Sequence, residues 1–194
     1  MAGVLWITGA GKGIGKAVAL EYATHGWTVA VSARTASDLD AVASQASAAG
    51  LEGKVISYPL DVTSHDSVKA TFKTIEAEQG SVDQIIFNAG THSPTPLGEF
   101  SVAPFRTLME VNYMGSVNGL DAVLPTFIDR RTGHVAIVAS VAGYSGLPDA
   151  AGYGATKAAL INMCESLKTQ LDGLGVTISV INPGFVRTPL TDQN

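Results

Sequence analysis

Short apolar runs rich in β-branched residues alternate six times with longer stretches of helical period in this chain. The runs lie at 4–8, 28–33, 54–59, 84–88, 135–140 and 176–182. They are almost continuously apolar, which is typical of parallel strands covered on both faces. This alternation predicts an α/β fold with one doubly wound parallel sheet. Such sheets bind ligands beyond the carboxyl ends of their strands, so we expect functional residues in the loops after the runs.

The stretches between the runs predict helices whose apolar residues recur three and four positions apart. The first three stripes are Ile14, Ala17, Val18 and Tyr22, then Leu39, Val42, Ala43 and Ala46, then Val68, Phe72 and Ile75. Two longer helical stretches, 103–130 and 152–173, carry apolar residues on more than one face. These are Val123, Leu124, Phe127, Ile128, Ala158, Leu160, Ile161 and Met163. They either only cover the sheet or also contact a second subunit.

Composition narrows the class of protein. A chain of 194 residues, 46% of them hydrophobic, predicts a single domain, 1–194, with a full core, which excludes disorder. The 12 basic residues are scattered among 17 acidic ones, which excludes a footprint for duplex nucleic acid. No apolar run approaches the roughly 18 residues that cross a bilayer. One cysteine and four dispersed histidines predict neither a disulfide nor a metal site. We therefore expect a cytoplasmic protein without nucleic-acid or membrane partners.

A glycine-rich segment, 8–15, joins the first run to the first predicted helix and reads Thr-Gly-Ala-Gly-Lys-Gly-Ile-Gly. Glycines allow a tight turn and let a pyrophosphate approach the backbone and the amino end of the helix. Glycine also serves ordinary turns between strands and helices. The position directly after a strand and before a helix favours the dinucleotide-binding interpretation.

The spacing of Gly9, Gly13 and Gly15 differs from the general G-x-G-x-x-G pattern of dinucleotide-binding sites. The pattern T-G-x-x-x-G-x-G resembles that of the short-chain dehydrogenase/reductase family. The resemblance implies a Rossmann fold with strand order 3-2-1-4-5-6, and cofactor contacts from Gly9, Lys12, Gly13, Ile14 and Gly15. It extends over 4–188, because further motifs follow in the family's order.

The end of the second run indicates which dinucleotide the site prefers. Sites for NAD usually place a carboxylate here for the ribose 2′-hydroxyl, but this chain has no acid before Asp38. Arg34 suits a 2′-phosphate, because a guanidinium makes planar, charge-assisted hydrogen bonds. Lys12 adds a second cation, and in the family a basic residue at either place accompanies NADP(H). We therefore expect NADP(H) in preference to NAD(H), unless both cations are only solvated surface charges.

Two further strand ends carry resemblances to the family's cofactor contacts. Asp61 and Val62 match the acid and its neighbour that contact the adenine, although a lone Asp here also suits a helix N-cap. Asn88, Ala89 and Gly90 match the last three residues of the N-N-A-G motif. Phe87 replaces the first Asn of that motif, which the family uses to stabilise the central sheet.

Tyr153 and Lys157 are four residues apart, so a helix places them on one face. This pair alone is a weak signal, since a surface pair has the same spacing. Ser140 ends the fifth run, Asn112 opens an N-x-x-G segment, and 183–188 matches the family's P-G-x-V-x-T turn. Because these features follow one another in the family's order, the Tyr153–Lys157 pair resembles the family's catalytic motif rather than a surface pair.

The resemblance implies a catalytic set of Asn112, Ser140, Tyr153 and Lys157. Tyr153 would be the general acid/base, with Lys157 and the positive nicotinamide favouring its phenolate. Ser140 would hold the substrate oxygen, and Asn112 a water that links Lys157 to solvent. Lys157 and Tyr153 would also contact the nicotinamide ribose. The cofactor contacts in the turn would be Pro183, Gly184, Val186 and Thr188.

The sequence indicates less about the substrate than about the cofactor or the catalytic residues. The pocket candidates His92, Pro94, Val141, Tyr144, Leu147 and Phe185 suit a small apolar ketone or alcohol, and they equally suit a filled core edge. The family's last strand and substrate loop are expected to be absent from 1–194. An NADP(H)-binding sensor or subunit with little turnover is therefore the alternative function. The family's two-fold pairing through the two long helices implies a homodimer and leaves a homotetramer open.

Overall fold

The computed structural model describes residues 2–188 of the chain. The strands in this part are β1 Val4–Thr8, β2 Thr28–Ser32, β3 Lys54–Ser57, β4 Val82–Phe87, β5 Gly133–Val138 and β6 Val176–Ile181. All pair in parallel, in the order β3-β2-β1-β4-β5-β6. The predicted doubly wound sheet and its strand order are confirmed.

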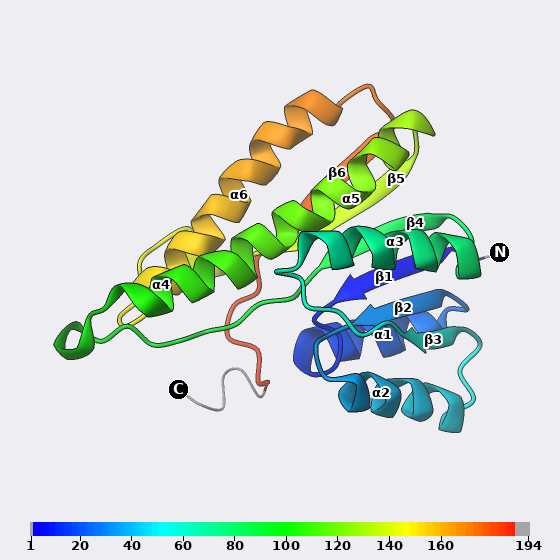
Figure 1. The fold of residues 1–194 in the computed structure, drawn as a ribbon, viewed down its shortest axis with the longest axis horizontal. Coiled ribbons are helices and arrows are strands. Elements are labelled where there is room, and N and C mark those ends of the chain that lie inside the picture. The colour runs from blue at the N-terminus through cyan, green and yellow to red at the C-terminus, as the bar shows by residue number, and fades with distance from the viewer. Residues whose placement is uncertain (1, 189–194) are drawn as a thin grey trace.

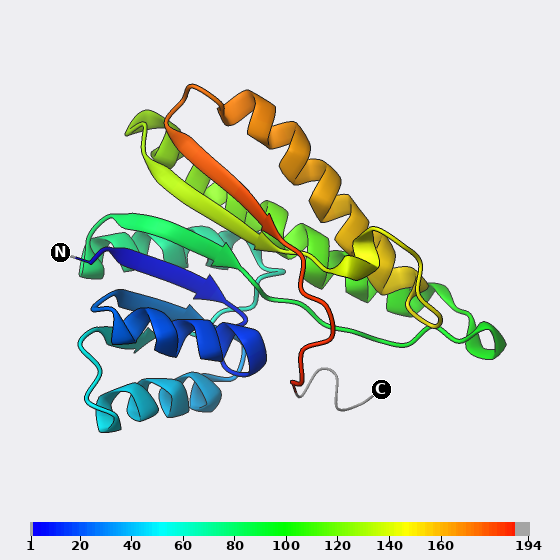
Figure 2. The same cartoon turned by 180° about the vertical axis from the view of Figure 1, so that it is seen from behind.

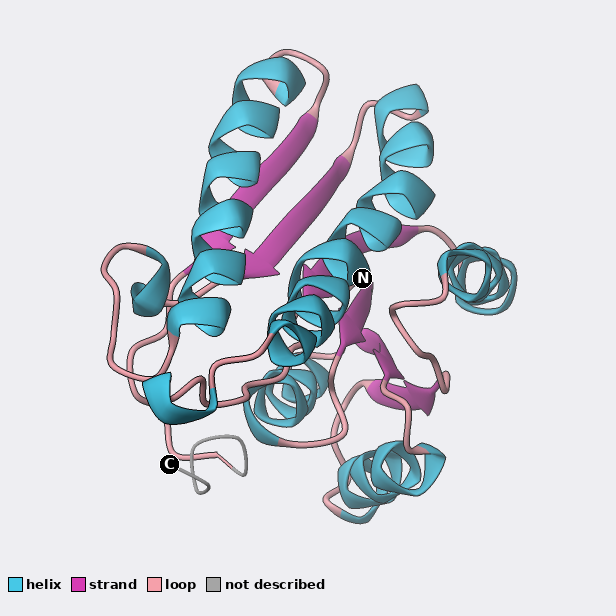
Figure 3. Ribbon diagram, turned by 60° about the vertical axis from the view of Figure 1, so that its left-hand side comes forward, coloured by secondary structure: helices cyan, strands magenta, loops and turns pink. Residues whose placement is uncertain are grey.

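Helices lie on both faces of the sheet, as the ribbon in Figure 3 shows. They are α1 Gly13–Thr24, α2 Ala36–Ala48, α3 His65–Gln79, α4 Val102–Leu108, α5 Gly115–Asp129 and α6 Ala151–Leu171. Shorter turns of helix are η1 Leu97–Glu99, η2 Met109–Met114 and η3 Val141–Gly143. Helices α3, α5 and α6 cover one face (Figure 1), and α1 and α2 cover the other (Figure 2). No helix in residues 2–188 combines the length and apolar character that crossing a bilayer requires.

The sheet separates two apolar cores. The larger core packs β1, β4 and β5 against α3, α5 and α6, and the smaller one packs the sheet against α1 and α2. Trp6 shows why β1 is the central strand. Its side chain is fully buried, its ring stacks on Phe72 of α3 with centroids 6.1 Å apart, and its indole N–H donates to Ser32 Oγ at 2.9 Å. The one polar atom of this large ring is therefore satisfied inside the core.

The α1 stripe predicted from the sequence is partly wrong. Ala17 is exposed, and Ile14, Val18 and Tyr22 are only half-buried. The buried face of α1 instead consists of Gly15, Ala19 and Ala23. Small residues let this helix lie close to the sheet, which a pattern based on large apolar side chains misses. The stripe of α3, by contrast, is confirmed, because Val68, Phe72 and Ile75 are all buried.

The stretch predicted as one helix over 103–130 consists of α4, the π-helical turn η2 and α5. Asn112 lies inside η2, where the wider turn accompanies a fully buried side chain with several polar partners. Single π-helical turns of this kind are frequent at functional sites. Strand β5 ends at Val138, so Ser140 lies two residues beyond the strand rather than at its end.

Half of the apolar residues named in the long helices belong to the core of this chain. Val123, Phe127, Leu160 and Ile161 are buried within the chain, so they cover the sheet and are unavailable to another subunit. Leu124 and Met163 are half-buried against the same core. Ile128 and Ala158 are exposed, so of the named set these two are the most accessible from outside.

Phe87, which stands where the family has Asn, packs against α5. Its side chain is 3% exposed, and Gly119 lies so close that a Cβ at that position would overlap the Phe87 ring. The absence of a side chain at Gly119 therefore makes the space that the ring occupies. The larger residue at position 87 is accommodated by packing rather than by polar contacts.

Candidate active site

The glycine-rich loop joins β1 to α1 at the carboxyl edge of the sheet. Gly9 has a φ of 67°, and a Cβ there would lie 2.6 Å from Ala89 Cα, so both conformation and space favour glycine. Asn88 fixes the loop, because its Nδ2 donates to the carbonyls of Thr8 at 3.2 Å and Gly9 at 3.0 Å. The side chains of α1's first turn include no acid, so the amino end of this helix is open to an anion.

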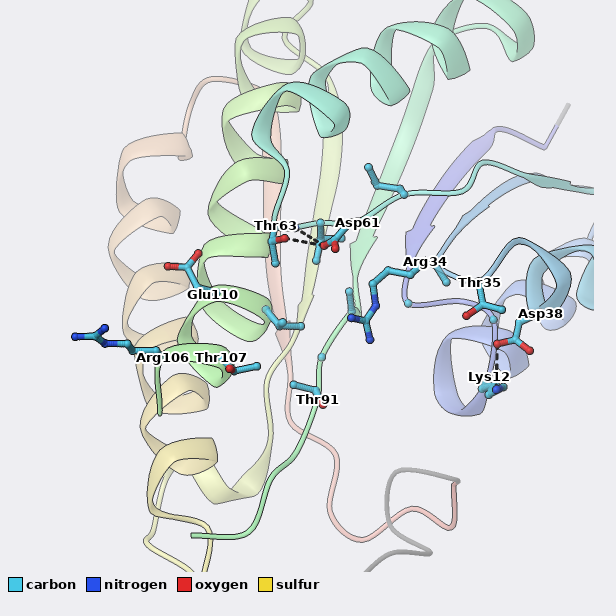
Figure 4. Close-up of a pocket in the computed structure, with 18 residues that line it drawn as sticks. Lys12, Arg34, Thr35, Asp38, Asp61, Thr63, Thr91, Arg106, Thr107 and Glu110 are labelled. Carbon is cyan, nitrogen blue, oxygen red and sulfur yellow. Dashed lines mark hydrogen bonds and ion pairs between the residues drawn. The ribbon is translucent and has the colours of Figure 1, made fainter. Parts of the chain in front are cut away.

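An open cavity of about 740 Å³ lies along this edge of the sheet. It is lined by residues that follow four strands and by part of η2, as Figure 4 shows. Predicted cofactor residues in its lining are Gly9, Lys12, Arg34, Asp61, Val62, Ala89 and Gly90. The cavity therefore brings together sequence positions that are up to about eighty residues apart.

Arg34 extends into this cavity and makes no ion pair with any carboxylate of residues 2–188 (Figure 4). Asp61 lies across from it, and its Oδ1 accepts hydrogen bonds from the backbone N–H of Thr63 at 3.0 Å and from Thr63 Oγ1 at 2.8 Å. These two bonds, with a smaller contribution from the Arg34 charge, lower the pKa of Asp61. Asp61 is therefore held as a carboxylate beside the cation.

Lys12 was expected to be a second cation available to a phosphate, but the structure pairs it with a carboxylate. Its Nζ forms an ion pair with Asp38 Oδ2 at 3.0 Å, and both side chains line the same cavity. Asp38, which the sequence motifs did not single out as a site residue, therefore belongs to the cavity wall. The motif pattern contained no signal for this pair, because the pairing depends on how α2 lies against the glycine-rich loop.

Tyr153 and Lys157 lie one turn apart on α6, with Lys157 Nζ 5.5 Å from the centroid of the Tyr153 ring. Lys157 is 4% exposed and donates to the carbonyl of Val138 at 2.9 Å. Burial lowers the pKa of Lys157 to about 8. Because few other groups contact this ammonium, desolvation of its charge dominates.

Burial also acts on Tyr153, and in the opposite direction from the expected phenolate. Loss of solvent raises the pKa of the Tyr153 hydroxyl, and a hydrogen bond with the Ser140 side chain partly opposes this rise. Ser140 Oγ also accepts from the backbone N–H of Ala142 at 3.1 Å, which fixes the hydroxyl at the start of η3. Burial therefore favours the neutral phenol over the phenolate.

The imidazole of His92 packs edge-on against the Tyr153 ring, with centroids 5.1 Å apart and planes at 87°. His92, expected near the substrate, therefore lies beside the candidate catalytic tyrosine. Pro94 is exposed two residues further on. The remaining expected rim residues are exposed after β5 and β6: Val141 (41%), Tyr144 (66%), Leu147 (38%) and Phe185 (90%).

Asn112 connects three parts of the site. Its Oδ1 accepts from the backbone N–H of Thr91 at 2.7 Å, and its Nδ2 donates to Thr91 O at 3.0 Å and to Thr156 Oγ1 at 3.1 Å. Thr156 Oγ1 in turn donates to the Tyr153 carbonyl at 2.7 Å. Thr91 and Thr156 were not expected as site residues, although Thr156 directly precedes Lys157 in the sequence.

Gly90 connects the cavity to the tyrosine and lysine. It lines the cavity, and a Cβ on Gly90 would lie 3.4 Å from Asn112 Oδ1 and 3.6 Å from Lys157 Nζ. The structure therefore brings Ser140, Tyr153 and Lys157 together at one end of the cavity. Within residues 2–188, no group of three or more histidine, cysteine, aspartate or glutamate side chains is arranged to hold a metal ion.

The turn after β6 lies over the same edge. The Pro183 carbonyl accepts from the backbone N–H of Val141 at 3.1 Å, and Asn182 Nδ2 donates to the Tyr144 hydroxyl at 2.8 Å. Gly184 and Val186 are exposed, and Thr188 reaches the glycine-rich loop, 3.4 Å from where a Cβ of Gly13 would lie. The expected cofactor residues of this turn therefore extend from the catalytic end back to the loop.

The cavity fits a nicotinamide dinucleotide. A Cβ on Gly9 would fill the space between the two loops, and the open amino end of α1 and the Arg34 side chain favour phosphate groups. Gly9 would face the pyrophosphate, Asp61 and Val62 the adenine, and Tyr153 and Lys157 the nicotinamide ribose. Gly13, Ile14, Gly15 and Asn88, also expected as cofactor residues, do not line this cavity, and Gly15 is buried against Asn88 and the Gly9 carbonyl.

Comparisons with known proteins agree with this geometry. A family model described as short chain dehydrogenase matches residues 3–194. An uncharacterized oxidoreductase of Myxococcus xanthus is 36% identical over 188 residues, covering 97% of this chain and 74% of that protein. The 3-oxoacyl-[acyl-carrier-protein] reductase FabG of Thermotoga maritima is 34% identical over 190 residues, covering 98% and 76%.

Solved structures with bound cofactors are similar as well. A short-chain dehydrogenase/reductase from Burkholderia phymatum in complex with NAD has a TM-score of 0.91 and 30% identity, covering 98% of this chain and 68% of that one. ElxO with NADP bound has a TM-score of 0.91 and 27% identity, covering 100% and 77%. With the family model spanning nearly the whole sequence, the chain belongs to the short-chain dehydrogenase/reductase family of oxidoreductases.

Proposed function

We propose that this chain is an NADP(H)-dependent oxidoreductase that interconverts a small apolar ketone and its alcohol, with Tyr153 as the general acid/base. The observation that carries the proposal is the assembly of Ser140, Tyr153 and Lys157 at one end of a dinucleotide-sized cavity. Residues 1–194 act in this proposal as one dinucleotide-binding domain. A cytoplasmic location is part of the proposal, since the one cysteine, Cys164, is a buried free thiol.

The nicotinamide cofactor, when bound, supplies or accepts the hydride. The chain's own residues handle the proton and the position of the substrate. The neutral Tyr153 phenol donates its proton to the oxygen of a carbonyl substrate, which is the general-acid role for a reduction. A phenol that keeps its proton at neutral pH can donate it when the substrate oxygen gains negative charge.

Ser140 and Lys157 support that proton transfer. The Ser140 hydroxyl already bonds the Tyr153 side chain, so both hydroxyls can hold one substrate oxygen. Lys157 has a pKa of about 8, which lets its ammonium exchange a proton near neutral pH beside the tyrosine ring. Asn112 fixes the Thr91 loop and Thr156, and we assign to it the water that links Lys157 to solvent.

The substrate class follows from the rim of the site. The apolar side chains of Val141, Leu147 and Phe185 are exposed in the loops that follow β5 and β6, and His92 packs against the Tyr153 ring. Such a rim favours a ligand with an apolar body and one polar oxygen. We further propose a homodimer through the outer faces of α5 and α6, supported by the exposed Ile128 and Ala158, and leave a tetramer open.

The preference for NADP(H) rests on Arg34, which lines the cavity after β2 and has no ion-pair partner among residues 2–188. Replacing it, Arg34→Asp, should weaken NADPH binding by about tenfold or more and improve NADH binding, because a carboxylate repels the 2′-phosphate and accepts from the 2′-hydroxyl. Titration of both cofactors by nicotinamide fluorescence measures the change. An unaltered ratio of the two dissociation constants would remove Arg34 from cofactor selection.

The function itself is tested by a panel of small ketones scored for NADPH consumption, run beside NADPH binding to the same protein. Binding with turnover of apolar ketones is the expected result. Tight NADPH binding with no turnover on any compound would replace the enzyme by the alternative, a cofactor-binding sensor or subunit. Failure to bind either dinucleotide would contradict both.

A further inference from the structure

The wall of the cavity beside the glycine-rich loop carries a pair of opposite charges. Lys12 Nζ and Asp38 Oδ2 are 3.0 Å apart, and the dashed line in Figure 4 marks this contact. The Lys12 side chain is 64% exposed and that of Asp38 is 28% exposed, so the carboxylate is the more enclosed partner. The loop therefore presents its cation to the cavity already bound to an anion.

The fold fixes Asp38 in this position. Asp38 lies in the first turn of α2, where a negative charge interacts favourably with the amino end of the helix. Its Cβ would lie 3.0 Å from a Cβ on Gly11, so the side chain packs directly on the backbone of the glycine-rich loop. Lys12 has the longer and more exposed side chain, so its ammonium group is the partner that can move.

Arg34 and Lys12 thus differ as phosphate ligands. Arg34 is free of carboxylate partners within residues 2–188, whereas the charge of Lys12 is compensated at 3.0 Å. To bind Lys12, the 2′-phosphate of the cofactor must break the ion pair between Lys12 and Asp38. The phosphate then lies near the Asp38 carboxylate, which repels it. The dianion gains less from this lysine than from an unpaired one.

We propose that Asp38 sets how strongly the site discriminates between NADPH and NADH, by holding Lys12 in an ion pair and withholding it from the 2′-phosphate. Asp38 is a positioning residue in this account, because it acts through Lys12. The proposal rests on the proposed use of a nicotinamide dinucleotide. Its consequence is a site in which Arg34 alone supplies most of the preference, so that NADH remains an acceptable cofactor.

The test is Asp38→Asn, which removes the charge and nearly preserves the shape of the side chain. Binding of NADPH and NADH to the full chain is titrated by nicotinamide fluorescence, and 2′-AMP and 5′-AMP serve as competing probes that differ in the position of the phosphate. The variant should bind NADPH and 2′-AMP about fivefold more tightly. Binding of NADH and 5′-AMP should stay within about twofold of the wild type.

Two further variants separate the action through Lys12 from other causes. In the presence of Lys12→Met, Asp38→Asn should give no gain for NADPH, since the lysine that it releases is missing. Asp40→Asn removes the same charge from an exposed position of the same helix and should change neither cofactor. This control excludes a general effect of the net charge.

Four results overturn the role of Asp38. A gain that persists beside Lys12→Met would mean that Asp38 repels the phosphate directly. Weaker NADH binding by Asp38→Asn would mean that Asp38 accepts a hydrogen bond from the ribose. Equal binding by wild type and variant would mean that the ion pair has no influence. A wild-type chain that binds neither dinucleotide would overturn the proposed function as well.

Discussion

Lys157 shows how a single residue of the candidate site lowers the stability of the folded chain. Its ammonium is buried to 4% exposure, with the Val138 carbonyl at 2.9 Å as its hydrogen-bond acceptor. Burial lowers its pKa from an ordinary value of 10.5 to about 8. The folded chain therefore binds this proton less well than the unfolded chain, and at pH 7 the difference destabilises the fold by about 3 kcal/mol.

The sign of this effect gives a pH dependence. Between pH 8 and 10.5 the unfolded state still holds the proton that the folded state has lost, so stability rises with pH across this window. Lys157→Met should remove that rise and stabilise the chain by about 1–3 kcal/mol at pH 7, while abolishing activity. Urea unfolding at several pH values measures both changes.

Lys168→Met is the matched control, because Lys168 lies on the same helix and its side chain is 62% exposed. It should leave the stability profile unchanged. The same slope between pH 8 and 10.5 in Lys157→Met and in the wild type would contradict the assignment of the rise to Lys157.

Sequence motifs supplied the candidate catalytic side chains but not the groups that hold them. Ser140, Tyr153 and Lys157 were predicted because they occur in the order of the motifs of the short-chain dehydrogenase/reductase family, which the sequence resembles. The Lys12–Asp38 pair and the Thr91 contact of Asn112 depend on how distant segments pack, which no local pattern records. The rise in the pKa of Tyr153 was also not predicted, because burial is a property of the folded chain.

At the scale of elements, the contact between β4 and α5 replaces a polar motif by a packed one. The Phe87 ring occupies the space left by the missing side chain of Gly119. Gly119→Ala should destabilise the chain by about 1–3 kcal/mol, since an added methyl in a filled core forces side chains or backbone to shift. Thermal unfolding measures the loss.

Gly146→Ala is the control for an added methyl, because nothing lies within 4 Å of a Cβ at that position. Combining Gly119→Ala with Phe87→Leu should recover part of the lost stability, as expected for two groups in contact. Additive effects of the two substitutions would show that Gly119 and Phe87 do not share this space.

Elements themselves were predicted better than their boundaries. Short apolar runs located each of the strands in residues 2–188, and the central strands β1, β2, β4 and β5 are largely buried, as such runs indicate. Strand β4 begins at Val82, two residues earlier than expected, since pairing with β1 extends it past Asp83. The π-helical turn around Asn112 was not predicted, because the tertiary hydrogen bonds of this side chain, to Thr91 and Thr156, are not visible in a local sequence pattern.

In the whole molecule, the loops with the candidate cofactor residues and the loops with the candidate catalytic residues lie at one edge of the sheet. The glycine-rich loop and Arg34 follow β1 and β2, while Ser140 and the turn at Pro183 follow β5 and β6. Because all strands are parallel, these loops meet at the same edge, and Gly90 after β4 connects them. The fold therefore places the cavity and the Tyr153 hydroxyl at one edge of the sheet, and this placement is the basis of the proposed reaction.

The most direct test of Tyr153 as the proton donor compares turnover and cofactor binding in Tyr153→Phe. The substitution keeps the ring that packs against His92 and removes only the hydroxyl. We predict that turnover of the best ketone in the panel falls by about a thousandfold, while NADPH binds within about threefold of the wild type. Turnover close to that of the wild type would contradict the assignment of Tyr153 as the proton donor.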